Sequence, residues 1–257
     1  MEREAAPGYR GVVGRLLILC GSAESAALAR AVSDAGIEAV AHLTGDPREP
    51  AIDALPVVTS PLGRDAANRR RSMSELIERV GAEGVLAADH PFGAGAGAAR
   101  LACGRRGLPF LRLCRAPWTP EEGDDWRAVP SGCGVMRAVP PGATLFAAAG
   151  PWVAERLAAH DGWVHCRRLD AEAPPYPHRN GAWCLGAGPF TVEGEAALFE
   201  RLGIECLVTR NVGGEGAWPK VGAARRLGLP VVMIDMPPQP EPRVRTVEEA
   251  LGWAKAR

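Results

Sequence analysis

Short apolar runs and amphipathic segments alternate along the first part of the chain. The runs are bounded by glycine, proline or charged residues, which is typical of buried strands, and alanine-rich segments with helical periodicity lie between them. Ser72 or Ser74 is expected to cap the second helix and Gly81 to end it. The expected strands are Leu16–Cys20, Glu38–Leu43, Pro56–Thr59, Val85–Ala88 and Phe110–Leu113, and the expected helices are Glu24–Ala35, Ser74–Val80 and Gly93–Arg106. This order predicts βαβ units and a parallel sheet covered by helices on both faces.

The same alternation returns after Pro117–Gly142, a segment rich in proline, glycine and acidic residues that is interpreted as a connector. The last helix begins at Thr246 and has Glu249 three residues later, which is the pattern of a capping box. The expected strands are Thr144–Ala148, Trp163–Cys166, Ala182–Leu185, Cys206–Thr209 and Val231–Ile234, and the expected helices are Trp152–His160, Val192–Leu202, Pro219–Leu227 and Thr246–Lys255. We therefore expect domains at residues 14–118 and 143–257, joined by a connector at 119–142.

Two stretches, Ala98–Leu113 and Ala223–Ile234, are similar to each other and mark corresponding places in the two halves. Each contains a helix rich in alanine and arginine, a Gly-Leu-Pro turn and a short apolar strand. Their separation is too long for a solenoid repeat but fits two successive α/β domains. The expected fold class is therefore α/β, with two Rossmann-like domains, parallel sheets flanked by helices, and a ligand cleft between them.

Composition and charge indicate which classes of binding partner the protein is expected to have. The 257 residues include 30 basic and 30 acidic side chains, so net charge provides no general attraction to nucleic acid or an anionic membrane. No apolar run is long enough for a signal peptide or a membrane span. The seven cysteines are scattered without a Cys-x-x-Cys pair, which favours free thiols in a reducing compartment over zinc ligands or disulfides. We expect a cytoplasmic protein without a bound metal, either a monomer or a weak homodimer.

Two strand ends in the first half carry candidate chemistry. Gly21 and Ser22 form a turn between the first strand and a helix, where backbone amides can approach a phosphate. The full Gly-x-Gly-x-x-Gly pattern is absent, so an ordinary βα turn is equally compatible with this segment. His90 follows the fourth strand, at the carboxyl edge where open α/β sheets bind ligands. It either acts on a ligand there or caps the helix that follows.

Glycines also follow strands in the second half. Gly213 and Gly214 indicate special backbone angles or close contact with a ligand, and Gly188 lies in a similar turn after the preceding strand. Lys220 places a cation at the start of a helix, the unfavourable end of the helix dipole, and a bound anion would explain this placement. We favour a ligand site over an ordinary turn here. The five histidines show no metal-binding spacing, and no local Ser/His/Asp signature is present.

Taken in order, these segments resemble the precorrin-6A reductase family of vitamin B12 biosynthesis. The resemblance covers roughly Leu16 to Trp253. It is carried by Cys20-Gly21-Ser22-Ala23-Glu24-Ser25, Ala87-Ala88-Asp89-His90-Pro91-Phe92-Gly93, Leu111-Arg112-Leu113-Cys114-Arg115-Ala116-Pro117-Trp118, Ala187-Gly188-Pro189-Phe190 and Val208-Thr209-Arg210-Asn211-Val212-Gly213-Gly214, followed by Lys220, Ala223, Ala224 and Arg225. It implies an oxidoreductase that transfers a hydride from NADPH to one double bond of a carboxylate-bearing tetrapyrrole, precorrin-6A or its cobalt form.

The resemblance also implies roles for individual residues. His90 lies nearest the expected hydride path and is assigned a positioning or proton-donating role. Arg48, with His42 and Thr44 beside it, is the candidate for contact with the adenosine 2′-phosphate. The full set of expected cofactor contacts is Gly21, Ser22, Ala23, Glu24, His42, Thr44, Arg48, Ala88 and Asp89. The expected substrate contacts are Arg112, Arg115, Gly188, Asn211, Gly213, Gly214 and Lys220.

Three segments depart from the family pattern. Thr44-Gly45-Asp46 replaces Ala-Gly-Arg, residues 60–65 replace a glycine-rich loop, and Ala149-Gly150-Pro151 replaces Thr-Gly-Arg. The acid at Asp46 would repel a 2′-phosphate unless Arg48 compensates for it. Two alternatives follow from these departures: a non-catalytic homologue that binds a tetrapyrrole or nucleotide, and an NADH-dependent reductase of another substrate.

Overall fold

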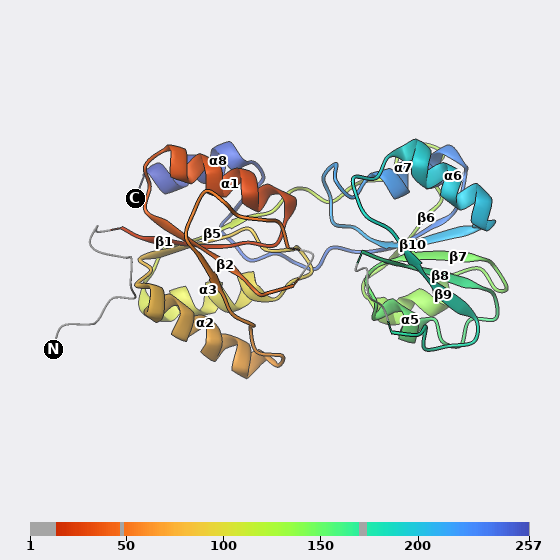
Figure 1. The fold of residues 1–257 in the computed structure, drawn as a ribbon, viewed down its shortest axis with the longest axis horizontal. Coiled ribbons are helices and arrows are strands. Elements are labelled where there is room, and N and C mark those ends of the chain that lie inside the picture. The colour runs from red at the N-terminus through yellow and green to blue at the C-terminus, as the bar shows by residue number, and fades with distance from the viewer. Residues whose placement is uncertain (1–13, 47–48, 170–173, 257) are drawn as a thin grey trace. The chain divides into compact units, whose positions relative to one another are not determined.

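The computed structural model describes residues 14–46, 49–169 and 174–256. The chain forms two compact α/β units, each built on its own six-stranded sheet (Figure 1). The first unit contains the chain up to Arg115 together with the segment from Pro238 onward, and the second unit is Ala116–Pro237. This arrangement confirms the expected fold class of parallel sheets flanked by helices.

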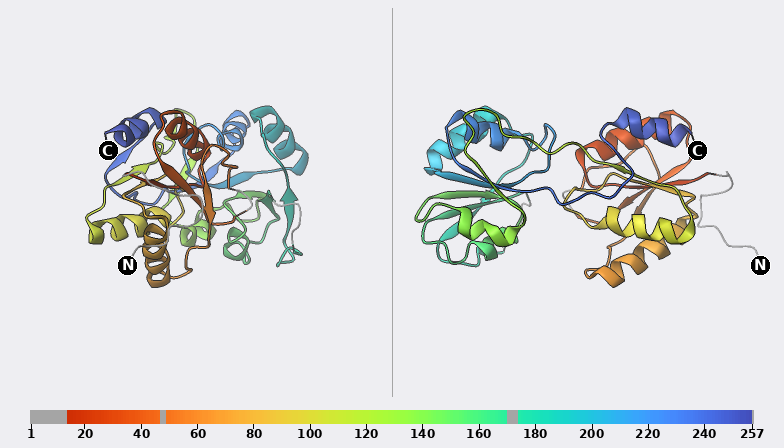
Figure 2. Two further views of the ribbon diagram at one scale, coloured as in Figure 1. Left: turned by 60° about the vertical axis from the view of Figure 1, so that its left-hand side comes forward. Right: turned by 180° about the vertical axis from the view of Figure 1, so that it is seen from behind.

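The sheet of the first unit has the strand order β12-β5-β4-β1-β2-β3, and all its neighbouring strands are parallel. Helices α1 and α8 cover one face and α2 and α3 cover the other (Figures 1 and 2). The strands are β1 (Leu16–Leu19), β2 (Ala39–Leu43), β3 (Val57–Thr59), β4 (Gly84–Ala87), β5 (Phe110–Leu113) and β12 (Arg243–Val244). The helices are α1 (Ala23–Asp34), α2 (Ala66–Val80), α3 (Gly95–Arg106) and α8 (Val247–Lys255).

Strand β1 is buried along its whole length because both of its faces meet helices. Leu17 and Leu19 point into the core that contains α2 and α3, whereas Leu16 and Ile18 belong to the core that contains α1 and α8. The alternation of side chains in a strand therefore divides one apolar run between two cores. A continuous apolar sequence is what a central parallel strand requires.

The sheet of the second unit has the order β6-β11-β10-β7-β8-β9, again with parallel neighbours. Helices α6 and α7 cover one face, and α5 lies on the other (Figures 1 and 2). The strands are β6 (Trp126–Val129), β7 (Leu145–Ala148), β8 (Val164–Arg168), β9 (Gly181–Leu185), β10 (Cys206–Arg210) and β11 (Val231–Ile234). The helices are the 3-10 turn η1 (Gly132–Gly134), α4 (Val135–Ala138), α5 (Val153–Arg156), α6 (Val192–Leu202) and α7 (Pro219–Arg226).

The division of the chain differs from the expected one at both of its boundaries. The expected connector contains β6, which pairs with β11 and so completes the second sheet. The last twenty residues belong to the first unit, because β12 pairs with β5 and α8 packs in the core of α1. The pattern of α8 identified an amphipathic helix, but a pattern does not show which sheet a helix covers.

Helix ends follow capping chemistry more closely than apolar periodicity. Helix α2 begins at Ala66 rather than Ser74, because the carboxylate of Asp65 accepts the amides of Ala67 and Asn68 and caps it. The expected stop at Gly81 is confirmed, with a φ of 64°. The capping box of α8 is also confirmed, with both of its reciprocal hydrogen bonds present. Helix α5 is much shorter than the expected Trp152–His160.

Within the described part of the chain, no helix combines the length and the apolar character needed to cross a membrane. The seven cysteines are free thiols, and most are buried. Among the described residues, no group of three or more His, Cys, Asp or Glu side chains could hold a metal ion.

Candidate functional site

The carboxyl ends of β5, β4, β1 and β2 are adjacent in the first sheet. Each of these strands leads directly into one of the segments selected from the sequence: the turn at Gly21 after β1, Thr44 after β2, Asp89 and His90 after β4, and Arg115 after β5. The topology therefore gathers the expected residues of the first half at one edge. In open α/β sheets this edge is where ligands bind.

The turn after β1 is held in a tight, glycine-dependent conformation. Gly21 has a φ of +143°, and a Cβ atom at this position would lie 3.3 Å from the backbone nitrogen of His90. The Gly21 amide donates to Oγ of Ser25 at 3.3 Å, and that hydroxyl donates to the Ser22 carbonyl at 2.6 Å. The Ser22 amide donates to the Ala88 carbonyl at 3.1 Å, which joins the turn to the end of β4.

Helix α1 starts at Ala23, immediately after this turn, and Ser22 is its N-cap residue. The Ser22 side chain makes no capping hydrogen bond to the first turn of the helix. The N-terminus of a twelve-residue helix thus lies at the sheet edge with its partial positive charge, which suits an anionic ligand. Ala88 holds the turn through its backbone. Its amide donates to the Leu19 carbonyl of β1, and its carbonyl accepts the Ser22 amide.

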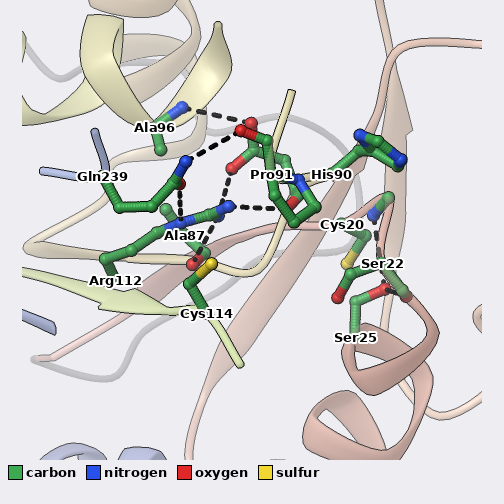
Figure 3. Close-up of polar contacts among 12 residues, drawn as sticks. Cys20, Ser22, Ser25, Ala87, His90, Pro91, Ala96, Arg112, Cys114 and Gln239 are labelled. Atoms are coloured by element: carbon green, nitrogen blue, oxygen red, sulfur yellow. Dashed lines mark hydrogen bonds and ion pairs between the residues drawn. The ribbon is translucent and has the colours of Figure 1, made fainter. Parts of the chain in front are cut away.

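Asp89 is anchored by a buried ion pair with Arg112 of β5 (Figure 3). Nη1 of Arg112 donates to Oδ1 of Asp89 at 2.6 Å, and Nη2 donates to the Asp89 carbonyl at 2.9 Å. The same guanidinium also donates to the Ala87 carbonyl and to the side chain of Gln239. Arg112 is 1% exposed. Arg112 therefore has a structural role inside the unit, and its contact with the substrate stays a prediction.

The glycine-rich segment after His90 makes room for Asp89. Oδ2 of Asp89 accepts the amide of Ala96 at 3.2 Å, in the first turn of α3. A Cβ atom on Gly95 would lie 2.9 Å from this oxygen, and one on Gly93 would lie 2.9 Å from the His90 carbonyl. The small residues of this segment thus allow the helix to approach the carboxylate closely.

His90 does not cap α3. Its Nδ1 accepts the backbone amide of Phe92 at 3.1 Å, and it is Asp89 that bonds to the first turn of the helix. An Nδ1 that accepts leaves the proton of the neutral imidazole on Nε2. Figure 3 shows the His90 ring on the side of the turn that contains Cys20 and Ser22.

Glu24 and Arg115 were expected to contact the cofactor and the substrate respectively, but in the structure they form an ion pair with each other. Burial acts to raise the pKa of Glu24, but the hydrogen bond and charge of Arg115 outweigh it, and the pKa lies below its usual value. The Glu24 carboxylate is therefore ionised at neutral pH.

The residues expected at the 2′-phosphate have three different outcomes. His42 is 1% exposed, its Nε2 lies 3.0 Å from the Ser60 carbonyl oxygen, and burial lowers its pKa. It is therefore neutral and positioned by the protein, and its contact with the phosphate stays a prediction. Thr44 lies at the sheet edge but bonds to Glu49. Arg48 lies outside the described residues.

In the second unit, the side chain of Asn211 forms hydrogen bonds with the backbone of Trp118. Its Oδ1 accepts the Trp118 amide and its Nδ2 donates to the Trp118 carbonyl, each at 2.8 Å. The indole of Trp118 donates to the Gly214 carbonyl at 2.9 Å. Asn211 thus holds the backbone of Trp118, and its contact with the substrate stays a prediction. Gly213 and Gly214 have φ angles of 66° and 69°, as expected for left-handed backbone.

Lys220 is partly buried at the start of α7, where its Nζ donates to the Ala217 carbonyl at 2.6 Å. Burial lowers its pKa to about 8, and the charge of Glu195 only partly counteracts this. Glu195 is 4% exposed and pairs with Arg167 at 2.7 Å. Arg167 also lies 4.5 Å from the centre of the Phe190 ring, in the turn that contains Gly188. Phe190 and Lys220 thus lie beside the ion pair of Arg167 and Glu195.

Several contributors could not be found from the sequence. Gln239 joins the site because the chain returns to the first unit, and its Nε2 donates to the Pro91 carbonyl at 2.9 Å. No sequence motif singled out Arg167 as a site residue. Glu49 did have a signal, because it follows Asp46 by three residues in a loop, a spacing that allows a side chain to bond back to preceding amides.

A glycine turn that leads from a central parallel strand into a helix, at an edge where four strands end, defines an α/β protein of the Rossmann type. More particularly, the chain belongs to the family described as precorrin-6x reductase CbiJ/CobK, whose model matches residues 15–255. This confirms the family indicated by the sequence motifs. It is a family of reductases, and a reductase of this fold uses a nicotinamide cofactor.

Individual relatives agree with this family over nearly the whole chain. The precorrin-6A reductase of Rhodobacter capsulatus is 34% identical over 243 residues, covering 93% of this chain and 95% of the relative. The precorrin-6A reductase of Mycobacterium tuberculosis is 32% identical, covering 93% and 96%. The cobalt-precorrin-6A reductase of Priestia megaterium is 26% identical, covering 86% and 90%. The solved structure of CobK precorrin-6A reductase matches with a TM-score of 0.84 at 33% identity, covering 95% of this chain and 97% of that one.

Proposed function

We propose that this protein reduces one double bond of precorrin-6A, or of its cobalt form, with NADPH as the hydride donor. The observation that carries the proposal is the Gly21 turn at the start of α1, in a chain that belongs to the precorrin-6x reductases. NADPH is the donor implied by the resemblance to that family. When bound, it supplies the hydride, while the protein supplies orientation and electrostatics.

The first unit fits a dinucleotide at its sheet edge. The turn at Gly21 packs so closely on the segment after β4 that a Cβ atom would lie 3.3 Å from the His90 nitrogen, and the amides at the start of α1 provide donors for the pyrophosphate. Ser22, Ala23 and Glu24 would line this position, with Asp89 fixed behind it by Arg112. In the second unit, Lys220 and the backbone at Gly213 and Gly214 are the proposed contacts for carboxylates of the tetrapyrrole.

The direct test is anaerobic incubation of the purified protein with precorrin-6A and, in separate samples, NADPH or NADH. Reduction of the macrocycle is followed by its absorption spectrum together with oxidation of the cofactor. We expect stoichiometric loss of reduced nicotinamide and a new tetrapyrrole spectrum with NADPH. Binding of both ligands without any reduction would instead identify a non-catalytic homologue.

His90 is the proposed proton donor or positioning group. Its Nδ1 accepts the Phe92 amide, so the neutral ring carries its proton on Nε2. We expect His90→Ala to lower the turnover number by about 100-fold, the lower range for loss of a general acid. The melting temperature should change little, because the hydrogen bond of the ring to the Phe92 amide lies within a local turn. Turnover and thermal unfolding are measured on the same preparation. A lowered melting temperature with unchanged turnover would make His90 a structural residue.

The charged ammonium group of Lys220 is expected to lower the free energy of unfolding of the protein. Its pKa is about 8 in the folded protein against 10.5 as its ordinary value, so folding disfavours the charged form. The resulting penalty is complete below pH 8 and disappears as pH rises toward 10.5. Lys220→Met should therefore raise the free energy of unfolding by about 1–3 kcal/mol at pH 7, and by much less at pH 10.

The same variant should weaken binding of the tetrapyrrole by about tenfold, the effect of losing one charge-assisted contact. Urea unfolding at the two pH values and substrate titration at pH 7 provide the measurements. A Lys220→Met protein that is less stable at pH 7 and binds substrate normally would show that the ammonium group has a structural role only.

A further inference from the structure

The loop after β2 closes on a carboxylate of its own. Oε1 of Glu49 accepts the Thr44 amide at 2.9 Å and the Thr44 hydroxyl at 2.8 Å. Oε2 accepts the amides of Gly45 at 3.0 Å and Asp46 at 3.1 Å. Gly45 has a φ of +87°, which allows successive amides to converge on one point. These four donors form an anion receptor, and the anion within it is the side chain of Glu49.

This receptor lies where the adenosine ribose of a bound dinucleotide is expected. Strand β2 is the parallel neighbour of β1, with Leu19 in register with His42, so the loop begins next to the Gly21 turn. In dinucleotide-binding sheets, the adenosine ribose lies at the end of the second strand when the pyrophosphate lies at the first turn. Burial raises the pKa of Cys20 to about 12, and the charge of Glu49 also acts to raise it, which places that charge near the end of β1.

A carboxylate in this position treats the two nicotinamide cofactors differently. A ribose 2′-hydroxyl is uncharged and is not repelled by it, whereas a 2′-phosphate carries like charge and needs hydrogen-bond donors. The phosphate would also need the donors that Glu49 already occupies. Asp46, in the same loop, adds a second negative charge.

We propose that Glu49 is a specificity-determining residue of the cofactor site, and that its carboxylate competes with the 2′-phosphate of NADPH for the donors of the β2 loop. This inference rests on the proposed nicotinamide-binding function and refines it. Glu49 lowers the affinity for NADPH relative to NADH, because the phosphate must displace an internal anion and the hydroxyl need not.

The test uses two nucleotides that differ only at the 2′ position, adenosine 2′,5′-bisphosphate and adenosine 5′-monophosphate, titrated calorimetrically into the full chain. Glu49→Gln removes the charge, and Glu49→Ala also removes the oxygens. The matched control is Asp53→Asn, an equal change of charge in the segment between β2 and β3, where the exposed Asp53 pairs only weakly with Arg30.

We expect the affinity ratio of bisphosphate to monophosphate to rise about tenfold in both Glu49 variants, since like charges about 4 Å apart cost at least ~1 kcal/mol per unit charge. The rise should be smaller at high salt. The ratio in Asp53→Asn should stay within about twofold of wild type. The 5′-monophosphate serves as an internal reference, because it carries no charge at the 2′ position.

Three results would overturn the inference in distinguishable ways. An unchanged ratio in the Glu49 variants, with both nucleotides still bound, rejects the role of Glu49 and leaves the proposed function standing. An equal loss of affinity for both nucleotides shows that Glu49 only maintains the loop. If neither nucleotide binds to wild type or to any variant, the proposed cofactor site fails together with the inference.

Discussion

Replacing Gly21 with valine is expected to reduce the affinity for the nicotinamide cofactor by more than ~100-fold. The φ of +143° at this position is one that residues with a Cβ atom rarely adopt, and the added side chain would start 3.3 Å from the His90 nitrogen and 3.5 Å from Cα of Asp89. It would therefore distort the turn that leads into α1, where the pyrophosphate is proposed to bind. Cofactor fluorescence titration gives the affinity, and thermal unfolding shows whether the fold persists.

Gly36→Ala provides the matched control for this substitution. Gly36 also has a positive φ, 69°, but a Cβ atom there would have no neighbour within 4 Å. It lies just after the C-terminal end of α1, away from the carboxyl ends of the strands. We expect Gly36→Ala to cost about 1–2 kcal/mol of stability and to leave cofactor affinity unchanged. If Gly21→Val titrates with NADPH like wild type, the cofactor binds elsewhere.

Arg112→Met should destabilise the first unit by about 3–5 kcal/mol, because it leaves the Asp89 carboxylate buried without its partner. Arg112 is the largest fully buried side chain among the described residues, and it satisfies acceptors from β4, Asp89 and Gln239 together. Methionine preserves much of the side-chain volume of arginine. The loss of stability therefore arises from the missing polar contacts rather than from a cavity. Urea unfolding gives the free energy, and amide exchange in β4 and β5 locates the effect.

The double variant Asp89→Asn with Arg112→Met separates charge from packing. Removing the stranded charge should recover part of the lost stability, since the uncompensated carboxylate accounts for most of the cost. Normal stability of Arg112→Met combined with weaker substrate binding would contradict the structural role and return Arg112 to the substrate site.

The fold was largely predictable because its central strands are continuous apolar runs. β1 and β11 are buried throughout, and such runs between helical segments indicate a parallel sheet whatever the detailed packing is. The strands that escaped prediction lie at sheet edges. β12 has two residues, and β6 contains the exposed Arg127 and has only Val129 buried, so neither produces an apolar run.

The site was predictable in position but less so in the roles of its residues. Strand ends can be located from sequence, and Gly21, Asp89 and His90 lie at one edge as their placement implied. Which charged groups pair with one another depends on distances across the fold. The pairs of Glu24 with Arg115 and of Asp89 with Arg112 join residues more than twenty positions apart, and no local pattern distinguishes them from ligand contacts.

The insertion of the second unit within the first affects how the protein emerges from the ribosome. Residues 116–237 are continuous and can close their sheet as soon as they are synthesised, whereas the first sheet must wait for β12 and α8. Until then, the core around Leu28 lacks Ala250 and Ala254, which later complete it. The nascent first unit is therefore expected to expose apolar surface while the second unit is made, which makes it a natural client for chaperones during translation.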